Sequence, residues 1–192
     1  MMILLDPDLE PDPAPVSPAA AQTAASGPSE PKQDLRVPTA RTLARFLAKA
    51  QEAVGLSGQV TVLLTTDAAL RDLNRRFRGK NKATDVLSFP AKPLQNAKPA
   101  GQVAGDIAIS VKTARCQAAE QGHALATEIK VLILHGVLHL AGYDHESDAG
   151  RMRRRERDLR AQLGLPLGLI ERTSLQQSTR PKPRRTAGAR KR

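Results

Sequence analysis

The fold of this chain is decided by residues 125–145, whose sequence is LATEIKVLILHGVLHLAGYDH. Apolar residues cover nearly the whole circumference of a helix drawn over residues 125–141, and a helix that is apolar all round is buried. Gly142 follows, where a helix can end with a residue of positive φ at low cost. The stretch therefore predicts the central helix of the core, on which neighbouring side chains can fix the rotamers of polar residues.

Three of the four histidines of the chain lie at the end of this stretch: His135, His139 and His145. His135 and His139 are four residues apart, so they project from one face of the helix. A turn at Gly142 can bring His145 back towards them. Three converging imidazoles with a fourth position left for water form an open, catalytic zinc site. We predict one Zn²⁺ at these histidines, with nickel or copper possible on ligand type.

The alternative is a structural metal, which would need a fourth protein ligand. His123, Asp144 or Glu146 could serve, although structural zinc sites typically use thiolates and Cys116 is the only cysteine. Cys116 itself is expected to pack on a helix as a small apolar residue. Asp144 could instead orient a ligand histidine from outside the coordination shell, or cap the last helix.

The histidine spacing is that of the metzincin proteases, H-E-x-x-H-x-x-G-x-x-H. Those enzymes need the glutamate after the first histidine as their general base. In this chain that position is Gly136, which has no side chain. The sequence therefore argues against a peptidase, and we expect Gly136 to leave space beside the metal for a bulky substrate.

Composition indicates the partner and the compartment. The chain has 192 residues and a net charge of +11, which points to a polyanion and first to nucleic acid. A single cysteine fits a reducing compartment. The N-terminus does not resemble a signal peptide, and no apolar run reaches the length of a membrane span. We expect a cytoplasmic protein of one domain with appendages and without a membrane partner.

Basic residues cluster in a loop that begins at Arg78 and in an arginine-rich helix predicted from about residue 147 to residue 163. A guanidinium such as that of Arg78 can clamp phosphate oxygens and stabilise charge that develops in a displacement at phosphorus. Both clusters could also be solvated surfaces without a ligand. The candidate RNA-binding residues are Lys80, Lys82, Arg151, Arg154 and Arg155.

The remaining periodicities predict strands and helices in mixed order. Ile3 to Leu5 could be a frayed terminus or a strand. Strands are expected at residues 60–65, 86–89 and 105–110. Helices are expected before Gly55, from a cap at Asp67 with Leu70, Leu73 and Phe77 on one apolar face, and from a cap at Ser110 to Gly122. This strand-poor, helix-rich order predicts an α+β fold.

Three segments together resemble the YbeY family, the bacterial rRNA maturation endoribonucleases. They are residues 135–145, TDVLSFP at 84–90 and GDIAIS at 105–110, and Leu73-Asn74 with Phe77-Arg78-Gly79 also matches. The resemblance covers about residues 36–165. It implies a single-strand-specific, metal-dependent endoribonuclease that acts in 16S rRNA 3′-end maturation and ribosome quality control. It also implies zinc on the three motif histidines, catalytic roles for His135 and Arg78, and a small mixed sheet of about four strands packed with five or so helices.

The resemblance changes the expected domain organisation. Residues 1–5 become the first strand of the domain, 6–35 a disordered Pro/Ala-rich insertion, 36–170 the catalytic domain, and 171–192 a basic disordered tail. Expected partners are rRNA, other single-stranded RNA, and the ribosome or small-subunit assembly factors. The insertion, the basic last helix and the tail depart from the family pattern and leave their roles open. A ribosome-assembly RNA-binding factor with a structural metal is the alternative, and Gly136 disfavours a metallopeptidase.

Overall fold

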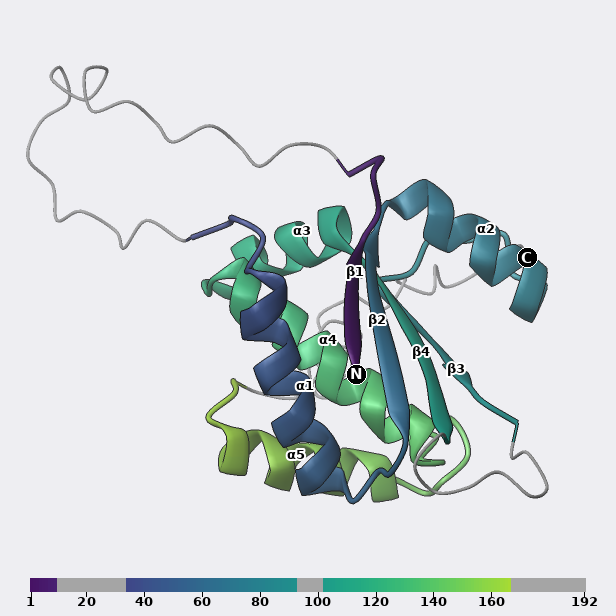
Figure 1. The fold of residues 1–192 in the computed structure, drawn as a ribbon, viewed down its shortest axis with the longest axis vertical. Coiled ribbons are helices and arrows are strands. Elements are labelled where there is room, and N and C mark those ends of the chain that lie inside the picture. Colours follow the sequence, from purple (N-terminus) through teal and green to yellow (C-terminus); the bar gives the residue numbers. More distant parts are fainter. Residues whose placement is uncertain (10–33, 93–101, 167–192) are drawn as a thin grey trace, which may run out of the picture.

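The computed structural model describes residues 1–9, 34–92 and 102–166 (Figure 1). The expectations for most of the 6–35 insertion and for the 171–192 tail lie outside these residues. The described part has the predicted α+β fold, with a four-stranded mixed sheet and five helices. Its elements are β1 (Met2–Leu5), α1 (Ala40–Val54), β2 (Gln59–Thr65), α2 (Asp67–Arg78), β3 (Val86–Pro90), β4 (Val103–Ser110), α3 (Val111–Gln121), α4 (Leu125–Leu140) and α5 (Arg151–Leu163).

The strands lie in the order β1-β2-β4-β3. β1 pairs in parallel with β2, and β2 pairs in parallel with β4. β3 runs antiparallel to β4 and forms one edge of the sheet, and β1 forms the other. The apolar run that begins at Ile3 is therefore a strand of the sheet and not a frayed terminus, because Ile3 faces Val62 in register.

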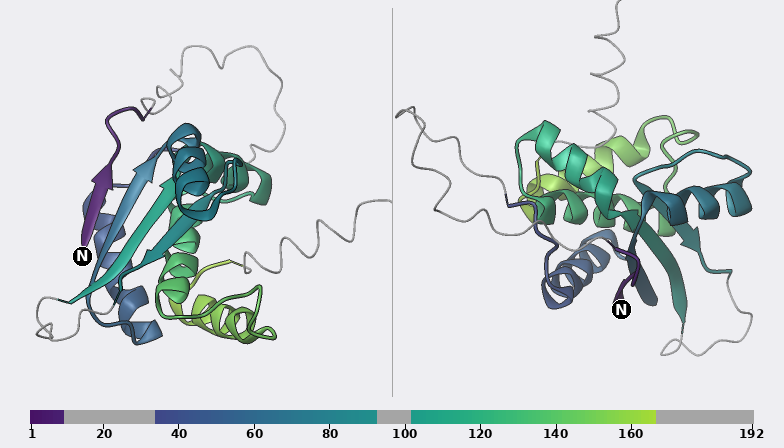
Figure 2. Two further views of the ribbon diagram at one scale, coloured as in Figure 1. Left: turned by 90° about the vertical axis from the view of Figure 1, so that its right-hand side faces the viewer. Right: turned by 90° about the horizontal axis from the view of Figure 1, so that it is seen from above.

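Strand alternation puts the apolar side chains of β2 and β4 on the face of the sheet that α1 and α4 cover (Figures 1 and 2). α4 is buried around its circumference, as the sequence predicts, because the sheet, α1, α3 and α5 surround it. A smaller cluster of Leu70, Leu87 and Ala108 joins α2 to the opposite face of β3 and β4. α4 is thus the central helix between the sheet and the outer helix α5.

Two predicted features of α2 are wrong. Its N-cap is Thr66, whose side chain accepts a hydrogen bond from the amide of Ala69, and not Asp67. The carboxylate of Asp67 instead accepts hydrogen bonds from the hydroxyls of Ser110 and Thr113, which join the start of α2 to the start of α3. Phe77 does not lie on the buried face; its side chain is exposed and contacts Phe89 edge to face.

The last helix begins later than the sequence suggests, at Arg151 rather than near residue 147. Ala149 and Gly150 both have positive φ, which a continuous right-handed helix does not allow. The carboxylate of Asp148 accepts hydrogen bonds from the amides of Gly150 and Met152 and so begins the helix.

The prediction that Cys116 packs as a small apolar residue is wrong, because its side chain is exposed. α3 buries Val111, Ala114 and Ala118, which lie on the other side of the helix.

Among the described residues, no single helix is long and apolar enough to cross a membrane. α3 and α4 meet that test only when they are taken together across a bend of 114°.

Candidate metal centre and cleft

The three histidines converge because α4 ends where the spacing predicts a turn. The helix finishes at Leu140, and Gly142 takes a φ of +85°. His145 returns to the end of the helix, and one ligand atom from each histidine lies within 4.8 Å of the others. His135 is buried, His139 is partly buried and His145 is exposed, so the cluster lies at the boundary between core and solvent.

The spacing of the imidazole nitrogens fits a metal ion. Nε2 of His135 and Nε2 of His139 are 3.1 Å apart. Two nitrogens bound to one tetrahedral zinc at 2.0–2.1 Å lie roughly 3.3 Å from each other. Burial, reinforced by the neighbouring His135 and His145, lowers the pKa of His139 to about 4. His139 is therefore neutral at pH 7, which is the form that a metal ligand needs.

The metal-free protein is expected to lose stability as the pH falls from 6.5 towards 4. An unfolded histidine titrates near 6.5, so the unfolded state binds a proton that folded His139 excludes until the pH nears 4. Solvent screening at this partly exposed site limits the loss to about 1–2 kcal/mol. Urea unfolding of chelator-treated protein at pH 6.5 and 4.5 measures it, and His139→Gln should show a smaller decrease. An equal decrease in both proteins would contradict the assignment to His139.

The histidines open into a cleft of about 590 Å³ between β3 and the end of α4. Arg78, at the end of α2, lines the same cleft, together with residues 84–88 and Pro90. The Nη2 atom of Arg78 lies 4.0 Å from Oε1 of Glu146, and both side chains are exposed to solvent. The structure thus brings Arg78 and the three histidines to one cavity, although they are far apart in the sequence.

Asp144 also lines the cleft, but its hydrogen bonds are local. Its carboxylate accepts hydrogen bonds from the amide of Glu146 and the hydroxyl of Ser147, and these bonds lower the pKa of its carboxyl group. The positive charges that His139 and His145 can carry lower that pKa further. Asp144 therefore shapes the loop that presents His145. No direct hydrogen bond joins it to a histidine in the described structure, and an orienting role remains a prediction.

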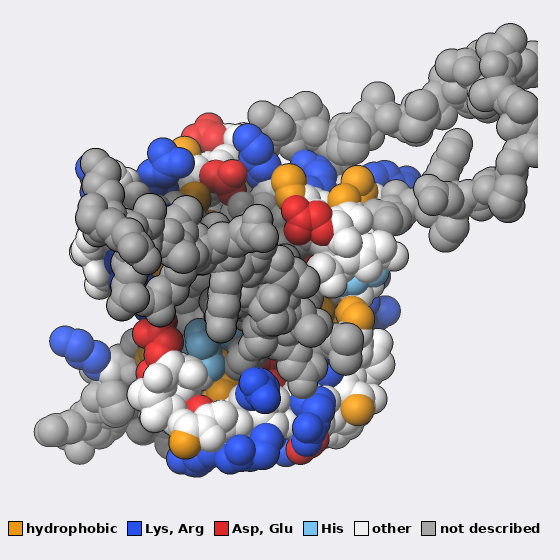
Figure 3. Space-filling view, turned by 180° about the vertical axis from the view of Figure 1, so that it is seen from behind, with side chains coloured by type: hydrophobic (Ala, Val, Ile, Leu, Met, Phe, Trp, Pro, Cys, Tyr) orange, Lys and Arg blue, Asp and Glu red, His pale blue; other side chains and the backbone are white. Residues whose placement is uncertain are grey.

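The five candidate RNA-binding residues fall into different environments. Lys80 and Lys82 are exposed after the end of α2 and do not line the cleft. Arg151 and Arg154 are exposed on α5, and the guanidinium of Arg151 lies 6.0 Å from the ring centre of Tyr143. Arg155 donates a hydrogen bond to the carbonyl of Ala53, which joins α5 to the end of α1. Basic side chains gather along the lower edge of the face in Figure 3, where α5 lies, and a histidine reaches the surface above them.

Gly136 does not leave space beside the metal, which corrects the sequence interpretation. A Cβ atom at this position would lie 2.8 Å from Cδ1 and 2.9 Å from Cγ2 of Ile107 on β4. The glycine therefore faces the sheet and allows α4 to approach β4 closely. A glutamate at this position would have to displace Ile107, so the packing of the helix excludes the general base of a metzincin.

The Gly136→Ala variant is expected to unfold with a free energy about 1–2 kcal/mol lower than that of the wild type. Overpacking against Ile107 outweighs the gain of about 1 kcal/mol in helix propensity. Urea denaturation measures the difference. In an Ile107→Ala background the added methyl group should no longer destabilise the protein. An equal loss in both backgrounds would show that the contact with Ile107 is not the cause.

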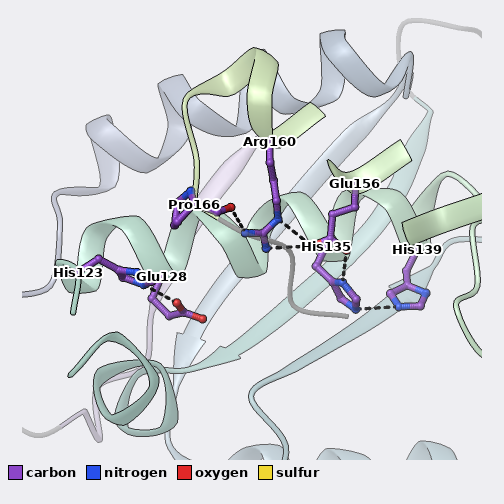
Figure 4. A network of polar contacts seen from close by, with 7 residues as sticks. All are labelled: His123, Glu128, His135, His139, Glu156, Arg160 and Pro166. Carbon is purple, nitrogen blue, oxygen red and sulfur yellow. Dashed lines mark hydrogen bonds and ion pairs between the residues drawn. The ribbon is translucent and has the colours of Figure 1, made fainter. Parts of the chain in front are cut away.

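Glu156 and Arg160 on α5 lie behind His135, and the sequence analysis did not single them out as site residues (Figure 4). Oε2 of Glu156 lies 3.3 Å from Nδ1 of His135, and Oε1 accepts hydrogen bonds from Nε and Nη2 of Arg160. The sequence contains a pattern that predicts the burial of Glu156. It lies four residues after Met152 and three before Leu159, on the apolar face of the helix. An acidic residue at such a position needs a buried partner.

His123 is not part of the cluster. Its Nε2 atom lies 2.6 Å from Oε2 of buried Glu128, near the start of α4 and at the other end of the helix from His139 (Figure 4). Among the described residues, the potential metal ligands that group together are His135, His139 and His145. The fourth protein ligand that a structural site would require is not found in that group.

The chain is similar to known proteins over most of its length. The family described as Endoribonuclease YbeY matches residues 29–164. An Endoribonuclease YbeY from Koribacter versatilis (strain Ellin345) is 50% identical over 160 residues, which cover 83% of this chain and 96% of that protein. One from Solibacter usitatus (strain Ellin6076) is 52% identical over 128 residues, or 67% of this chain and 82% of that protein. The chain therefore belongs to the Endoribonuclease YbeY family.

Proposed function

We propose that this protein is a single-strand-specific endoribonuclease that uses one Zn²⁺ at His135, His139 and His145. One observation carries the proposal: Arg78 and the histidine cluster line the same cleft in a member of an endoribonuclease family. Catalytic metal sites keep a coordination position open, and three protein ligands at a solvent boundary are consistent with that. Nickel or copper could occupy the same imidazoles in vitro.

The residues of the cleft have separable tasks in this proposal. When bound, the metal supplies Lewis-acid polarisation of a phosphoryl oxygen or lowers the pKa of a water molecule towards about 7. Arg78 clamps non-bridging phosphate oxygens and stabilises the negative charge that develops on them. His135 and His139 hold their ring nitrogens in fixed directions because α4 is buried. Exposed Lys80, Lys82, Arg151 and Arg154 add attraction for the phosphate backbone.

Membership of an endoribonuclease family supports an RNA substrate. We propose that the protein acts in the cytoplasm on rRNA, in 16S rRNA 3′-end maturation and in ribosome quality control. The ribosome or small-subunit assembly factors would then be its partners. The net charge of +11 supports a polyanionic substrate.

The competing proposal, an RNA-binding assembly factor with a structural metal, has less support. A structural zinc site is closed by four protein ligands, whereas exposed His145 completes a group of three histidines among the described residues. Metal removal separates the two proposals. A structural site should unfold with loss of the metal, and a catalytic site should keep its fold and stop turnover.

The test is an RNA-cleavage assay with end mapping on single-stranded and duplex substrates that contain the 3′ region of 16S rRNA. The purified protein is assayed after chelation and after zinc is restored, with circular dichroism as the measure of folding. Cleavage of the single strand that stops on chelation and returns with zinc supports the proposal. Equal cleavage by folded, metal-free protein would overturn the metal mechanism, and an absence of cleavage with zinc bound would favour the assembly factor.

A further inference from the structure

A buried ionic network connects α5 to the histidine cluster. The side chains of Glu156 and Arg160 are 1% and 3% exposed. Nη1 of Arg160 also donates a hydrogen bond of 2.6 Å to the carbonyl of Pro166, just beyond the helix (Figure 4). The network therefore runs from Pro166 through Arg160 and Glu156 to His135. Burying such charges is expensive, and an apolar pair of similar volume often gives equal or greater stability. Stability alone is therefore a poor reason for this arrangement.

The hydrogen bonds of the network determine which ring nitrogen of His135 carries the proton. Nε and Nη2 of buried Arg160 both donate to Oε1 of Glu156, at 3.0 and 2.9 Å, and this charge-assisted pair favours the ionised form of Glu156. Glu156 is thus a carboxylate, which can only accept hydrogen bonds. Arg160 occupies Oε1, and Oε2 faces Nδ1 of His135. A neutral His135 must then carry its proton on Nδ1, which leaves the lone pair of Nε2 directed at His139 and the cleft.

We propose that Glu156 is a positioning residue that holds His135 in the Nδ1-protonated tautomer, and that Arg160 fixes the orientation of Glu156. In the metal-free protein Nε2 of His135 then carries no proton, so it can bind the metal without a change of tautomer. The inference rests on the proposed function only in naming that metal, because the tautomer is a property of the metal-free protein. A carboxylate behind a ligand imidazole typically raises metal affinity 10–100-fold.

The Glu156→Gln variant tests the proposal because an amide has one acceptor atom and one donor group. Arg160 needs the acceptor, so the amide oxygen should stay with Arg160 and the NH₂ group should face Nδ1 of His135. Nδ1 must then accept a hydrogen bond, and the proton moves to Nε2, where it opposes metal binding. We expect the ¹⁵N chemical shifts of the His135 ring in metal-free protein to show Nδ1–H in the wild type and Nε2–H in the variant. Zinc affinity, from competition with a chromophoric chelator, should fall 10–100-fold.

Two further variants make the test specific. Asp158→Asn makes the same chemical change on the exposed side of α5, where Asp158 pairs with Arg157, and it should leave the tautomer and the zinc affinity unchanged. The double variant Glu156→Gln with Arg160→Met releases the amide from Arg160. The amide can then rotate its oxygen towards His135, so the Nδ1–H tautomer should return. A purely structural role for Glu156 predicts lower stability in the double variant and no return.

The wild-type spectrum alone can overturn the proposal, even if the variants fail to fold. An Nε2–H tautomer of His135 in the metal-free wild type would contradict it, and so would an unchanged tautomer in folded Glu156→Gln. Both results can be obtained without RNA and without metal. Failure of this inference is therefore distinguishable from failure of the proposed nuclease function, which the cleavage assay measures.

Discussion

The His135→Ala variant is expected to cleave single-stranded RNA roughly a thousandfold more slowly than the wild type, or not at all. Loss of the most buried ligand removes the metal and with it several kcal/mol of charge stabilisation in the transition state. His145→Ala should have the same effect on cleavage. Because His145 is exposed on the loop after α4, its removal leaves the core intact. Zinc content by mass spectrometry and cleavage rates on labelled RNA are the measurements.

The fourth histidine provides the control. His123 pairs with Glu128 near the start of α4 and lies outside the cluster. His123→Gln keeps a side chain that can hydrogen-bond Glu128, so its zinc content and cleavage rate should match the wild type. Wild-type cleavage by clean preparations of both His135→Ala and His145→Ala would refute the metal mechanism. If His123→Gln also loses cleavage, the loss in the other histidine variants would result from lower stability of the fold and not from loss of the metal.

The convergence of the three histidines and the burial of the central helix could be predicted because their signals are local. A spacing of four residues puts His135 and His139 on one helical face whatever surrounds them, and Gly142 marks the turn that returns His145. The apolar circumference of α4 likewise predicts its burial without knowledge of its neighbours. The capping of α3 by Ser110 and its end at Gly122 follow from the same local rules.

The boundary errors at Thr66 and Arg151 are local, but two larger errors concern residues whose role is set by a distant part of the chain. The sequence suggests open space at Gly136, but Ile107 fills it, and only the packing of α4 on β4 reveals that contact. The arginines of α5 look alike in the sequence, yet Arg160 is buried against Glu156, Arg155 contacts Ala53, and others are exposed. Such differences depend on tertiary contacts that local propensity does not encode.

The Arg78→Ala variant is expected to lower kcat for RNA cleavage by about 10²–10³-fold while zinc content and folding stay unchanged. Removal of one donor that stabilises developing negative charge typically has an effect of this size. Arg78 lines the histidine cleft, but its side chain is 48% exposed at the end of α2, so its loss leaves no cavity in the core. Arg78→Lys should recover only part of the rate, because an ammonium group cannot clamp two phosphate oxygens as a guanidinium does.

The nearby Arg76 separates a specific effect from a loss of positive charge. Arg76 lies on the same helix with a side chain that is 68% exposed, and its Nε is 2.7 Å from a carboxylate oxygen of Asp72. Arg76→Ala removes the same charge outside the cleft, so it should alter KM slightly and leave kcat unchanged. Equal losses in the two variants would make Arg78 a general electrostatic contact. A rise in KM alone for Arg78→Ala would place its contribution in substrate binding, whereas a fall in kcat at saturating RNA supports stabilisation of the transition state.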